Sequence, residues 1–306
     1  MNSRTTGGIA RAFAAAAISG VSVFVNGYGV HAVPDATVYT TTKNLVAAVL
    51  LVALLALVAA ARGTSRPVSL RRPQWMMLVA VAVIGGSVPF VLFFEGLARA
   101  SSTHAAFVQK TLVVWVAVLA IPLLGERLRP PHVAAMAMIV GGLVVLDGNL
   151  RGFRFGEGEL LVLAATALWA VEAVIAKRLL AGTPPLSVAV ARMGGGVVLL
   201  VGWLAVTGRL PALGHLGARG WLWSAATGAI LAGYVLAWYA ALARAGAIDV
   251  TAILTVGAVI TATLSTVVKG VAVSNTGLAG LALIAGGAAL VAALAAVPRR
   301  VRPAVP

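Results

Sequence analysis

A glutamate inside a long apolar stretch is the residue whose chemistry most needs explaining. Glu172 lies in LWAVEAVIAK, residues 168–177, where most neighbours are apolar. An ionised group at the centre of a membrane helix costs about 2.5–3.5 kcal/mol on insertion scales, so it normally faces protein or water. Glu172 could bind a cationic group or exchange protons. Alternatively, it could be a neutral carboxylic acid that is hydrogen-bonded in helix packing.

Cations inside apolar stretches form a second set of candidates. Lys110 lies roughly 10 Å into its stretch, where it could bind a carboxylate or pair with Glu95. Lys43 and Arg192 occupy similar places in the two halves of the chain, and we predict that they are structural cations near opposite ends of the fold. Glu126 precedes RLRPP, whose prolines begin a helix, which predicts that Glu126 stabilises a helix terminus.

Polar and aromatic side chains also recur at helical spacing in several apolar stretches. If these stripes converge at mid-depth, they enclose an aromatic-lined, mildly polar chamber suited to an amphipathic solute such as an amino acid. The alternative is that the aromatic residues pack or face lipid, and that Ser and Thr bond to their own helix. The predicted lining residues are Ser19, Ser22, Asn26, Phe90, Phe94, Lys110, Trp115, Trp169, Glu172, Tyr234, Trp238 and Thr255.

Several kinds of chemistry are disfavoured. The chain has no cysteine, which excludes disulfides, thiolate catalysis and cysteine metal sites. Its four histidines lie near the ends of apolar stretches, and no cluster has metal-ligand spacing or pairs a nucleophile with a base. We therefore expect no catalytic residues, metal or cofactor. The formal charge of +15 is spread in short clusters, so we expect no nucleic-acid partner.

The elements that must position these residues are membrane helices. Hydrophobic residues make up 61% of the 306, and charged ones 10%; the mean hydropathy is +1.02. About 20 helical residues cross the hydrocarbon core. The N-terminal segment lacks a clear signal-peptide cleavage site and is needed as the first span. Ten spans are predicted, at 9–30, 37–61, 75–97, 103–124, 132–148, 158–179, 185–206, 221–243, 249–269 and 276–297.

Loop charges predict the orientation of these spans. Arginine and lysine are concentrated in the loops that lie on the same side as both termini. The positive-inside rule then places both termini in the cytoplasm, as an even number of spans requires. Few lysines and many arginines and alanines suggest a bacterial source. The connections are short, so the working surface must lie among the helices.

An internal repeat divides the chain into two halves. GLARASSTHAAF at 96–107 aligns with ALARAGAIDVTA at 241–252, and the match continues at the same offset for about 50 residues. Residues 1–150 and 151–306 then hold five spans each. An odd number forces the halves into opposite orientations, an arrangement typical of secondary transporters. The spacings Ala137/Gly141 and Ala282/Gly286 predict close helix packing in the last span of each half.

The chain resembles the EamA-domain proteins of the drug/metabolite transporter superfamily. The resemblance rests on FFEGLARASSTHAAFVQKTLVVWVAVLAIPLLGERLRPPHVAAMAMIVGGLVVL at 93–146, with its Gly-Glu-Arg-Leu turn at 125–128. LLVLAATALWAVEAVIAKRLL at 160–180 looks like the sixth family helix, with Trp169 and Lys177 in its tryptophan and lysine slots. PPLSVAVARMGGGVVLL at 184–200 is similar to the seventh, with Arg192 in the basic slot.

The resemblance covers essentially the whole chain, with two departures. The second half has KGVAV where a second Gly-Glu is expected, and the first span lacks the usual tryptophan. The family implies an all-α inner-membrane carrier of ten helices in two inverted repeats that exports small metabolites. Within the family, the chain resembles the amino-acid exporters of the YddG type.

We therefore expect an alternating-access carrier of amphipathic metabolites, plausibly amino acids including aromatic ones. A passive channel and a membrane-embedded enzyme are the alternatives; the second is disfavoured. The expected partners are a small-molecule substrate and the lipid bilayer. The oligomeric state is left open, and a monomer would suffice.

Overall fold

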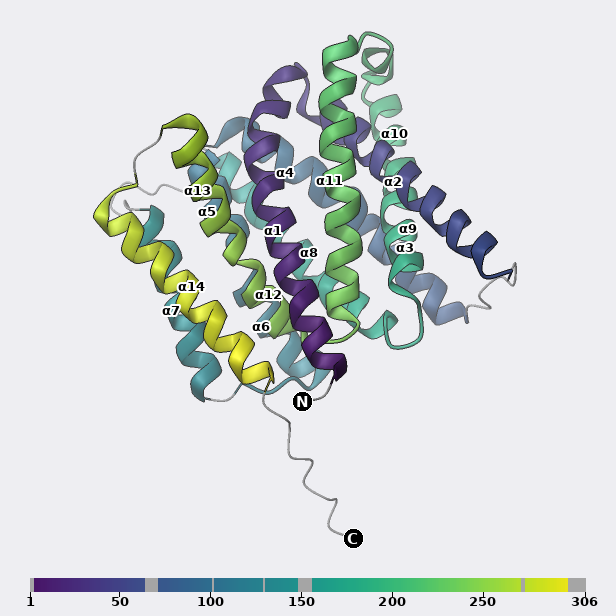
Figure 1. The fold of residues 1–306 in the computed structure, drawn as a ribbon. Coiled ribbons are helices and arrows are strands. Elements are labelled where there is room, and N and C mark those ends of the chain that lie inside the picture. The colour runs from purple at the N-terminus through teal and green to yellow at the C-terminus, as the bar shows by residue number, and fades with distance from the viewer. Residues whose placement is uncertain are drawn as a thin grey trace.

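The computed structural model describes residues 3–63, 71–100, 102–128, 130–147, 156–270 and 273–296, and every regular element among them is helical (Figure 1). The elements are α1 (Ser3–Ala32), α2 (Ala36–Ala61), α3 (Arg72–Gly86), α4 (Val88–Arg99), α5 (Ser102–Lys110), α6 (Leu112–Leu124), α7 (Pro130–Asp147), α8 (Glu157–Leu179), α9 (Pro185–Val190), the π-helix η2 (Ala191–Gly195), α10 (Gly196–Val206), the 3₁₀-helix η3 (Leu210–Leu213), α11 (Ala218–Leu242), α12 (Ala247–Leu254), α13 (Val256–Lys269) and α14 (Asn275–Ala296).

Nine helical segments among the described residues are long and apolar enough to cross a membrane. They agree with nine of the ten predicted spans to within a few residues. The fifth predicted span, 132–148, falls on α7, whose apolar part is the shorter Pro130–Val145. A tenth crossing therefore remains a prediction. The nine spans are Thr6–Ala32, Ala36–Ala61, Arg72–Arg99, Phe107–Leu124, Glu157–Leu179, Pro185–Val206, Ala218–Leu242, Ala247–Val268 and Asn275–Ala295.

Two of these spans break at threonines, and neither break was predicted. Thr111 separates α5 from α6, and Thr255 separates α12 from α13. The Oγ1 of each threonine donates a hydrogen bond of 2.6 Å to the carbonyl three residues earlier. This side-chain bond competes with the backbone hydrogen bonds of a regular helix. The helices that follow end at Gly125 and Gly270, both with φ of 66°, a left-handed conformation that glycine adopts without steric cost.

The span from Arg72 to Arg99 breaks at Ser87, between α3 and α4. The backbone of Ser87 has φ −131° and ψ −76°, and its hydroxyl donates to the carbonyl of Val83 at 2.9 Å. Pro89 follows two residues later and has no N–H to donate. The carbonyl of Gly85, four residues before Pro89, is therefore left without its helical partner.

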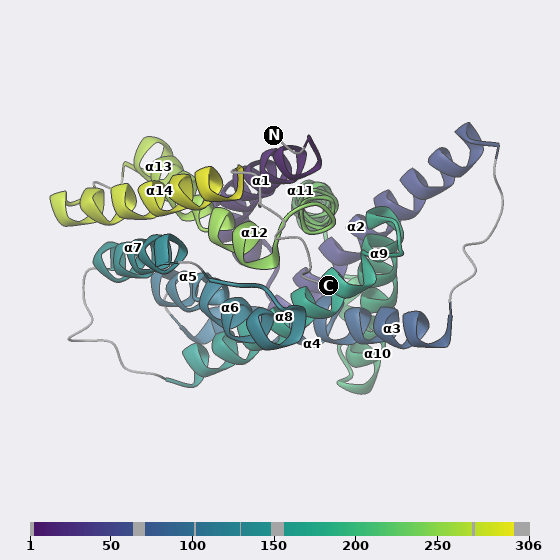
Figure 2. The same ribbon diagram turned by 90° about the horizontal axis from the view of Figure 1, so that it is seen from below.

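Helices α7 and α14 pack against each other at one side of the bundle (Figure 2). A Cβ on Gly142 would lie 2.6 Å from the carbonyl oxygen of Gly280, and one on Gly287 would lie 2.7 Å from that of Ala135. The predicted contact glycine Gly141 instead has no atom within 4 Å of such a Cβ. Close packing of the two helices thus occurs within the chain, with the closest approaches at Gly142 and Gly287. The predicted Gly286 also faces α7, where a Cβ would lie 3.1 Å from Cε of Met138.

The start of α1 and the end of α14 lie at the same end of the bundle, here called the termini end (Figure 1). Helix α1 begins there, where a Cβ on Gly8 would contact Arg244 and Ala245. Helix α8 begins at the opposite end. Glu157 in its first turn lies 3.8 Å from Arg99, the last residue of α4, and Glu95 of α4 accepts from Thr37, just after the far end of α1. The first long helices of the two halves therefore begin at opposite ends.

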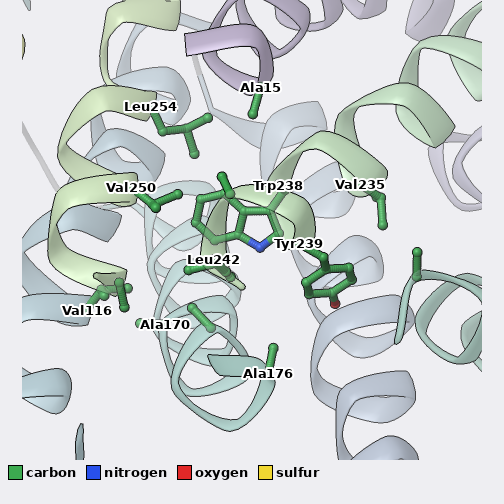
Figure 3. Close-up of a cluster of buried hydrophobic side chains, with 14 of the residues drawn as sticks. Ala15, Val116, Ala170, Ala176, Val235, Trp238, Tyr239, Leu242, Val250 and Leu254 are labelled. Atoms are coloured by element: carbon green, nitrogen blue, oxygen red, sulfur yellow. The ribbon is translucent and has the colours of Figure 1, made fainter. Parts of the chain in front are cut away.

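The buried core draws on most of the helices, and one large part of it is formed by side chains of α6, α8, α11 and α12. Trp238 and Leu242 of α11 lie among Val116, Ala170 and Val250 in this region (Figure 3). All five side chains are at most 2% exposed. Small residues on α8 let the neighbouring helices approach closely, and this packing fixes the face that α11 presents to the centre of the molecule.

Candidate functional site

A cavity of about 180 Å³ lies among the helices, and its wall includes most of the predicted lining residues. By this measure one water needs about 10–15 Å³, so the space accommodates a small solute. The predicted residues that line it are Ser19, Ser22, Asn26, Phe90, Phe94, Lys110, Trp169, Glu172, Tyr234, Trp238 and Thr255. Lys43 and Arg192 line it too.

Trp115 is the exception and lies outside the lining, with 39% of its surface exposed. Its prediction assumed a continuous helix in which Phe107, Thr111 and Trp115 share a face. Phe107 and Thr111 are absent from the lining as well. The side of this span that lines the cavity carries Gln109, Lys110, Leu112 and Val113, so the predicted stripe lies on a different face.

Glu172 is engaged by two partners within the protein. The hydroxyl of Tyr239 donates to its Oε1 at 2.5 Å, and the Nη1 atom of Arg192 lies 4.0 Å from its Oε2. Glu172 is 1% exposed and Arg192 4%. A buried ion pair of this kind is costly to break, because the remaining charge is then left without a partner. Tyr239 follows the predicted lining residue Trp238, but the sequence gives no signal of its contact with Glu172.

The carbonyl of Gly85 is the point where two cavity side chains converge. The indole Nε1 of Trp169 donates to it at 3.2 Å, and the Nε of Arg192 donates at 3.1 Å. This carbonyl lacks its helical partner because Pro89 has no N–H. A free carbonyl beside the break at Ser87 thus orients one side chain from α8 and one from η2.

Lys43, on α2, has a different environment. Its Nζ donates to Oδ1 of Asn26 at 3.1 Å, and the hydroxyl of Tyr39 donates to the same oxygen at 2.8 Å. The Lys43 ammonium lies 4.1 Å from the ring centroid of Phe94, 5.5 Å from that of Tyr39 and 5.7 Å from that of Phe90. The lysine is 3% exposed. Aromatic faces stabilise a desolvated cation in this geometry.

One expectation about the cations is wrong, and one of the two alternatives for Lys110 does not hold. Lys43 and Arg192 do not lie at opposite ends of the fold. Both line the central cavity and approach the ring of Phe90, with the guanidinium carbon of Arg192 6.0 Å from the centroid. Lys110 does not pair with Glu95, whose carboxylate binds Arg99 at 2.8 Å and Arg209 at 3.3 Å. Lys110 lines the cavity and is 8% exposed.

An aromatic wall runs along one side of the cavity. The ring centroids of Tyr39 and Phe94 are 5.9 Å apart, and those of Phe94 and Phe93 are 5.3 Å apart. Phe93 and Phe90 each lie 5.5 Å from Trp169. The Phe93–Trp169 pair is tilted and the other three pairs are edge-to-face. Edge-to-face contacts add to the stability that burial provides. The wall extends from the surroundings of Lys43 to those of Glu172.

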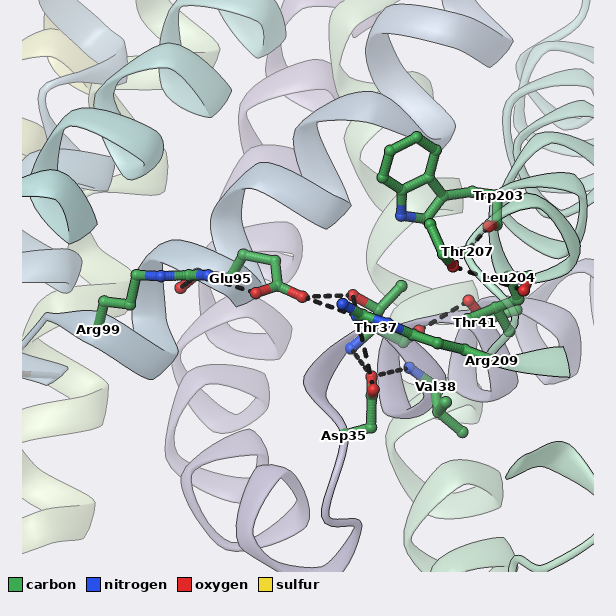
Figure 4. Close-up of polar contacts among 10 residues, drawn as sticks. All are labelled: Asp35, Thr37, Val38, Thr41, Glu95, Arg99, Trp203, Leu204, Thr207 and Arg209. Carbon is green, nitrogen blue, oxygen red and sulfur yellow. Dashed lines mark hydrogen bonds and ion pairs between the residues drawn. The ribbon is translucent and has the colours of Figure 1, made fainter. Parts of the chain in front are cut away.

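A charged network lies where α1 ends and α2 begins, at the end of the bundle opposite the termini (Figure 1). Figure 4 shows its contacts. Arg209 bridges Asp35 at 3.5 Å and Glu95 at 3.3 Å, and Thr37 donates to Glu95 at 2.7 Å. Asp35 also caps α2 by accepting from two backbone N–H groups. A second cavity of about 630 Å³ is lined by Asp35, Glu95 and Arg209, and shares Leu97 with the central one. The central cavity therefore adjoins a polar vestibule.

The termini end is held by three charged side chains. Glu126 accepts from the backbone N–H groups of Ala247 at 2.6 Å and Ile248 at 3.0 Å, at the start of α12. Lys177 donates to the carbonyls of Leu242 at 2.6 Å and Ala245 at 2.7 Å, and Arg178 donates to the carbonyl of Leu123. Glu126 thus stabilises a helix terminus as predicted, but the helix lies in the other half of the chain.

The described residues contain no group of three His, Asp or Glu side chains that could hold a metal ion. The lining instead combines buried charges with aromatic rings inside an all-helical protein that carries many apolar spans. These features define a multi-pass membrane protein with an internal site for a small solute.

Comparisons with known proteins identify the class. The model of the EamA-like transporter family matches residues 6–146 and 156–293, and the chain belongs to this family. The aromatic amino acid exporter YddG from Ancylobacter novellus is 31% identical over 251 residues, which are 77% of this chain and 83% of that exporter. A solved crystal structure shares the fold over 97% of this chain and 99% of its own, with a TM-score of 0.76 and 24% identity. The protein is therefore a membrane transporter with YddG-type relatives.

Proposed function

We propose that the protein exports small amphipathic metabolites, in particular amino acids including aromatic ones, across the bacterial inner membrane by alternating access. The observation that carries this proposal is the central cavity, in which Lys43, Arg192 and Glu172 lie beside the aromatic wall. Charged groups at this depth are expensive and are typical of substrate pathways. The similarity to the aromatic amino acid exporter YddG from Ancylobacter novellus supports the same substrate class.

We further propose that the two halves are inverted repeats. Three observations support this arrangement: α1 and α8 begin at different ends, Gly125 and Gly270 end equivalent helices with the same φ, and the family model matches the chain twice. Two such bundles can rock about a site between them.

The two ends of the cavity fit one state of such a cycle. Glu126 and Lys177 join helices across the termini end, whereas the polar vestibule adjoins the cavity at the opposite end. With both termini in the cytoplasm, as loop charges predict, this is an outward-facing state.

The decisive test is counterflow in liposomes that contain the purified protein. Liposomes preloaded with unlabelled phenylalanine should accumulate labelled phenylalanine, and the rate should saturate with its concentration. Empty liposomes provide the control. Flux that rises linearly without saturation would instead support a passive channel. Absence of protein-dependent accumulation for an entire amino-acid panel would reject the proposed substrate class.

A second measurement addresses coupling. If Glu172 exchanges protons during transport, an imposed pH gradient should change the net flux of phenylalanine. Flux that is independent of the gradient would support facilitated diffusion and a purely structural Glu172–Arg192 pair.

A further inference from the structure

The lining of the central cavity has more cationic than anionic side chains. Its lining includes three cationic side chains, Lys43, Lys110 and Arg192, and one carboxylate, Glu172. Arg192 faces Glu172, with 4.0 Å between the nearest nitrogen and oxygen. That pair leaves the two lysines as the excess charge of the described lining. Because a buried charge is costly without a counter-charge, a solute that brings an anion is favoured here.

Lys43 is the better placed of the two lysines to bind that anion together with an aromatic group. Among the described residues, its hydrogen-bond partner is the neutral amide oxygen of Asn26, which leaves further ammonium hydrogens to donate. The same amide oxygen accepts from Tyr39, and this second bond fixes its direction. The ring of Phe94, 4.1 Å from the ammonium, begins the aromatic wall that continues to Trp169.

Glu172 is poorly placed to bind an ammonium group. One of its oxygens accepts from Tyr239, and the other faces the guanidinium of Arg192. An incoming ammonium at the second oxygen would be repelled by the guanidinium of Arg192, 4.0 Å away. A carboxylate whose charge is already offset by a neighbouring cation attracts a solute cation less strongly.

We propose that the cavity binds the carboxylate of its solute at Lys43 and the aryl group against the aromatic wall, without an ionic partner for an α-ammonium group. The ligand class is therefore arylalkanoic acids, of which aromatic amino acids are members that carry an additional, unrecognised ammonium. This inference rests on the proposed function, because it concerns the substrate of the same cavity. Lys43 is then the residue that determines the preference for a carboxylate.

The first experiment measures binding by calorimetry to the full-length protein in lipid nanodiscs. The probes are three compounds of matched shape: 3-phenylpropanoate, 3-phenylpropan-1-ol and 3-phenylpropan-1-amine. The acid should bind about 10- to 100-fold more tightly than the alcohol, as a charge-assisted contact implies, and the amine should bind more weakly than the alcohol. Equal binding of acid and alcohol, or preference for the amine, would overturn the inference.

The second experiment assigns the contact to Lys43. In Lys43→Gln the affinity for the acid should fall to that of the alcohol, while alcohol binding is retained and shows that the site is folded. Arg219→Gln removes an exposed cation of α11 outside the lining and should leave the preference for the acid unchanged. Loss of the preference in Lys110→Gln, with its retention in Lys43→Gln, would place the carboxylate elsewhere and overturn the inference.

Asn26→Asp provides an independent variant that keeps every cation. It places a carboxylate beside the Lys43 ammonium, where the amide oxygen now lies 3.1 Å away. This internal anion should compete with the solute carboxylate and remove the preference for the acid without reducing alcohol binding. An unchanged preference would contradict the assignment.

Counterflow with phenylalanine separates this inference from the proposed function. If the acid binds through Lys43 but no amino acid is transported, the proposed function fails and the carboxylate site stands. If phenylalanine is transported but 3-phenylpropanoate neither binds nor competes, the site assignment fails and the proposed function stands.

Discussion

Lys43 and Arg192 are cations in corresponding places of the two halves, yet their surroundings differ. Arg192 lies beside Glu172 and donates to the carbonyl of Gly85, so its charge and geometry are accounted for within the protein. Lys43 donates to a neutral amide and is surrounded by aromatic rings. Under the proposed repeat, the two cations have different tasks: Arg192 holds the cavity wall together, and Lys43 is available to a solute.

The largest expected effect tests the holding role of Arg192. In Arg192→Leu, Glu172 is left buried without its cation, which should lower the free energy of unfolding by about 3–5 kcal/mol. Thermal unfolding in detergent, followed by tryptophan fluorescence, measures the change. The double variant Arg192→Leu/Glu172→Leu should recover most of the loss. Equal destabilisation by Lys43→Leu would erase the distinction between the two cations.

The next effect concerns the backbone contact that supports Arg192. A Cβ on Gly86 would collide with the carbonyl oxygen of Arg192, so Gly86→Ala should destabilise the protein by about 1–3 kcal/mol through overpacking. Gly194→Ala is the matched control, because a Cβ there meets no atom within 4 Å. The same unfolding assay applies to both. Similar stability of the two variants would show that η2 can move away from α3.

A smaller effect is expected at the termini end, where Glu126 connects the two halves. Glu126→Ala removes the cap of α12, which should cost the closed state about 0.5–2 kcal/mol. The chain has no cysteine, so a single Ser19→Cys can report opening through maleimide labelling from the termini side. Labelling should accelerate in Glu126→Ala. The highly exposed Glu157 gives a control variant, Glu157→Ala, that should label at the background rate.

The smallest effects compare two tryptophans, one inside and one outside the cavity. Trp169→Phe loses the hydrogen bond to Gly85, a net contribution of about 0.5–1.5 kcal/mol, and should slow phenylalanine counterflow several-fold. Trp115→Phe should leave the rate unchanged, because Trp115 is half-exposed and outside the lining. Comparable losses in both variants would show that the described cavity is not the route of transport.

The sequence predicted most of the cavity because its side chains lie near the centres of long helices with regular spacing. Ser19, Ser22 and Asn26 follow an uninterrupted helix, and all three line the cavity as the helical period requires. Apolar length likewise located nine of the spans. Such features depend on local periodicity, which is visible in a single sequence.

The missed features depend on which face of a helix packs inward and on contacts across the chain. Trp115 was misplaced because the face of its span that carries Lys110 and Val113 lines the cavity, and Trp115 lies on another face. The contact between Tyr239 and Glu172 joins α11 to α8, and Glu126 caps a helix more than a hundred residues away. The packing of two halves against each other decides these contacts, and a linear pattern does not encode it.

The proline at position 89 has a consequence that reaches well beyond its own helix. Because it carries no amide hydrogen, the oxygen of Gly85 becomes a docking point for an indole and a guanidinium from the second half. Any movement that separates these helices would leave the Gly85 oxygen without a hydrogen-bond donor unless a water molecule replaced the two side chains. Under the proposed alternating access, the missing amide hydrogen of Pro89 therefore favours the arrangement of the two halves in which both side chains reach Gly85.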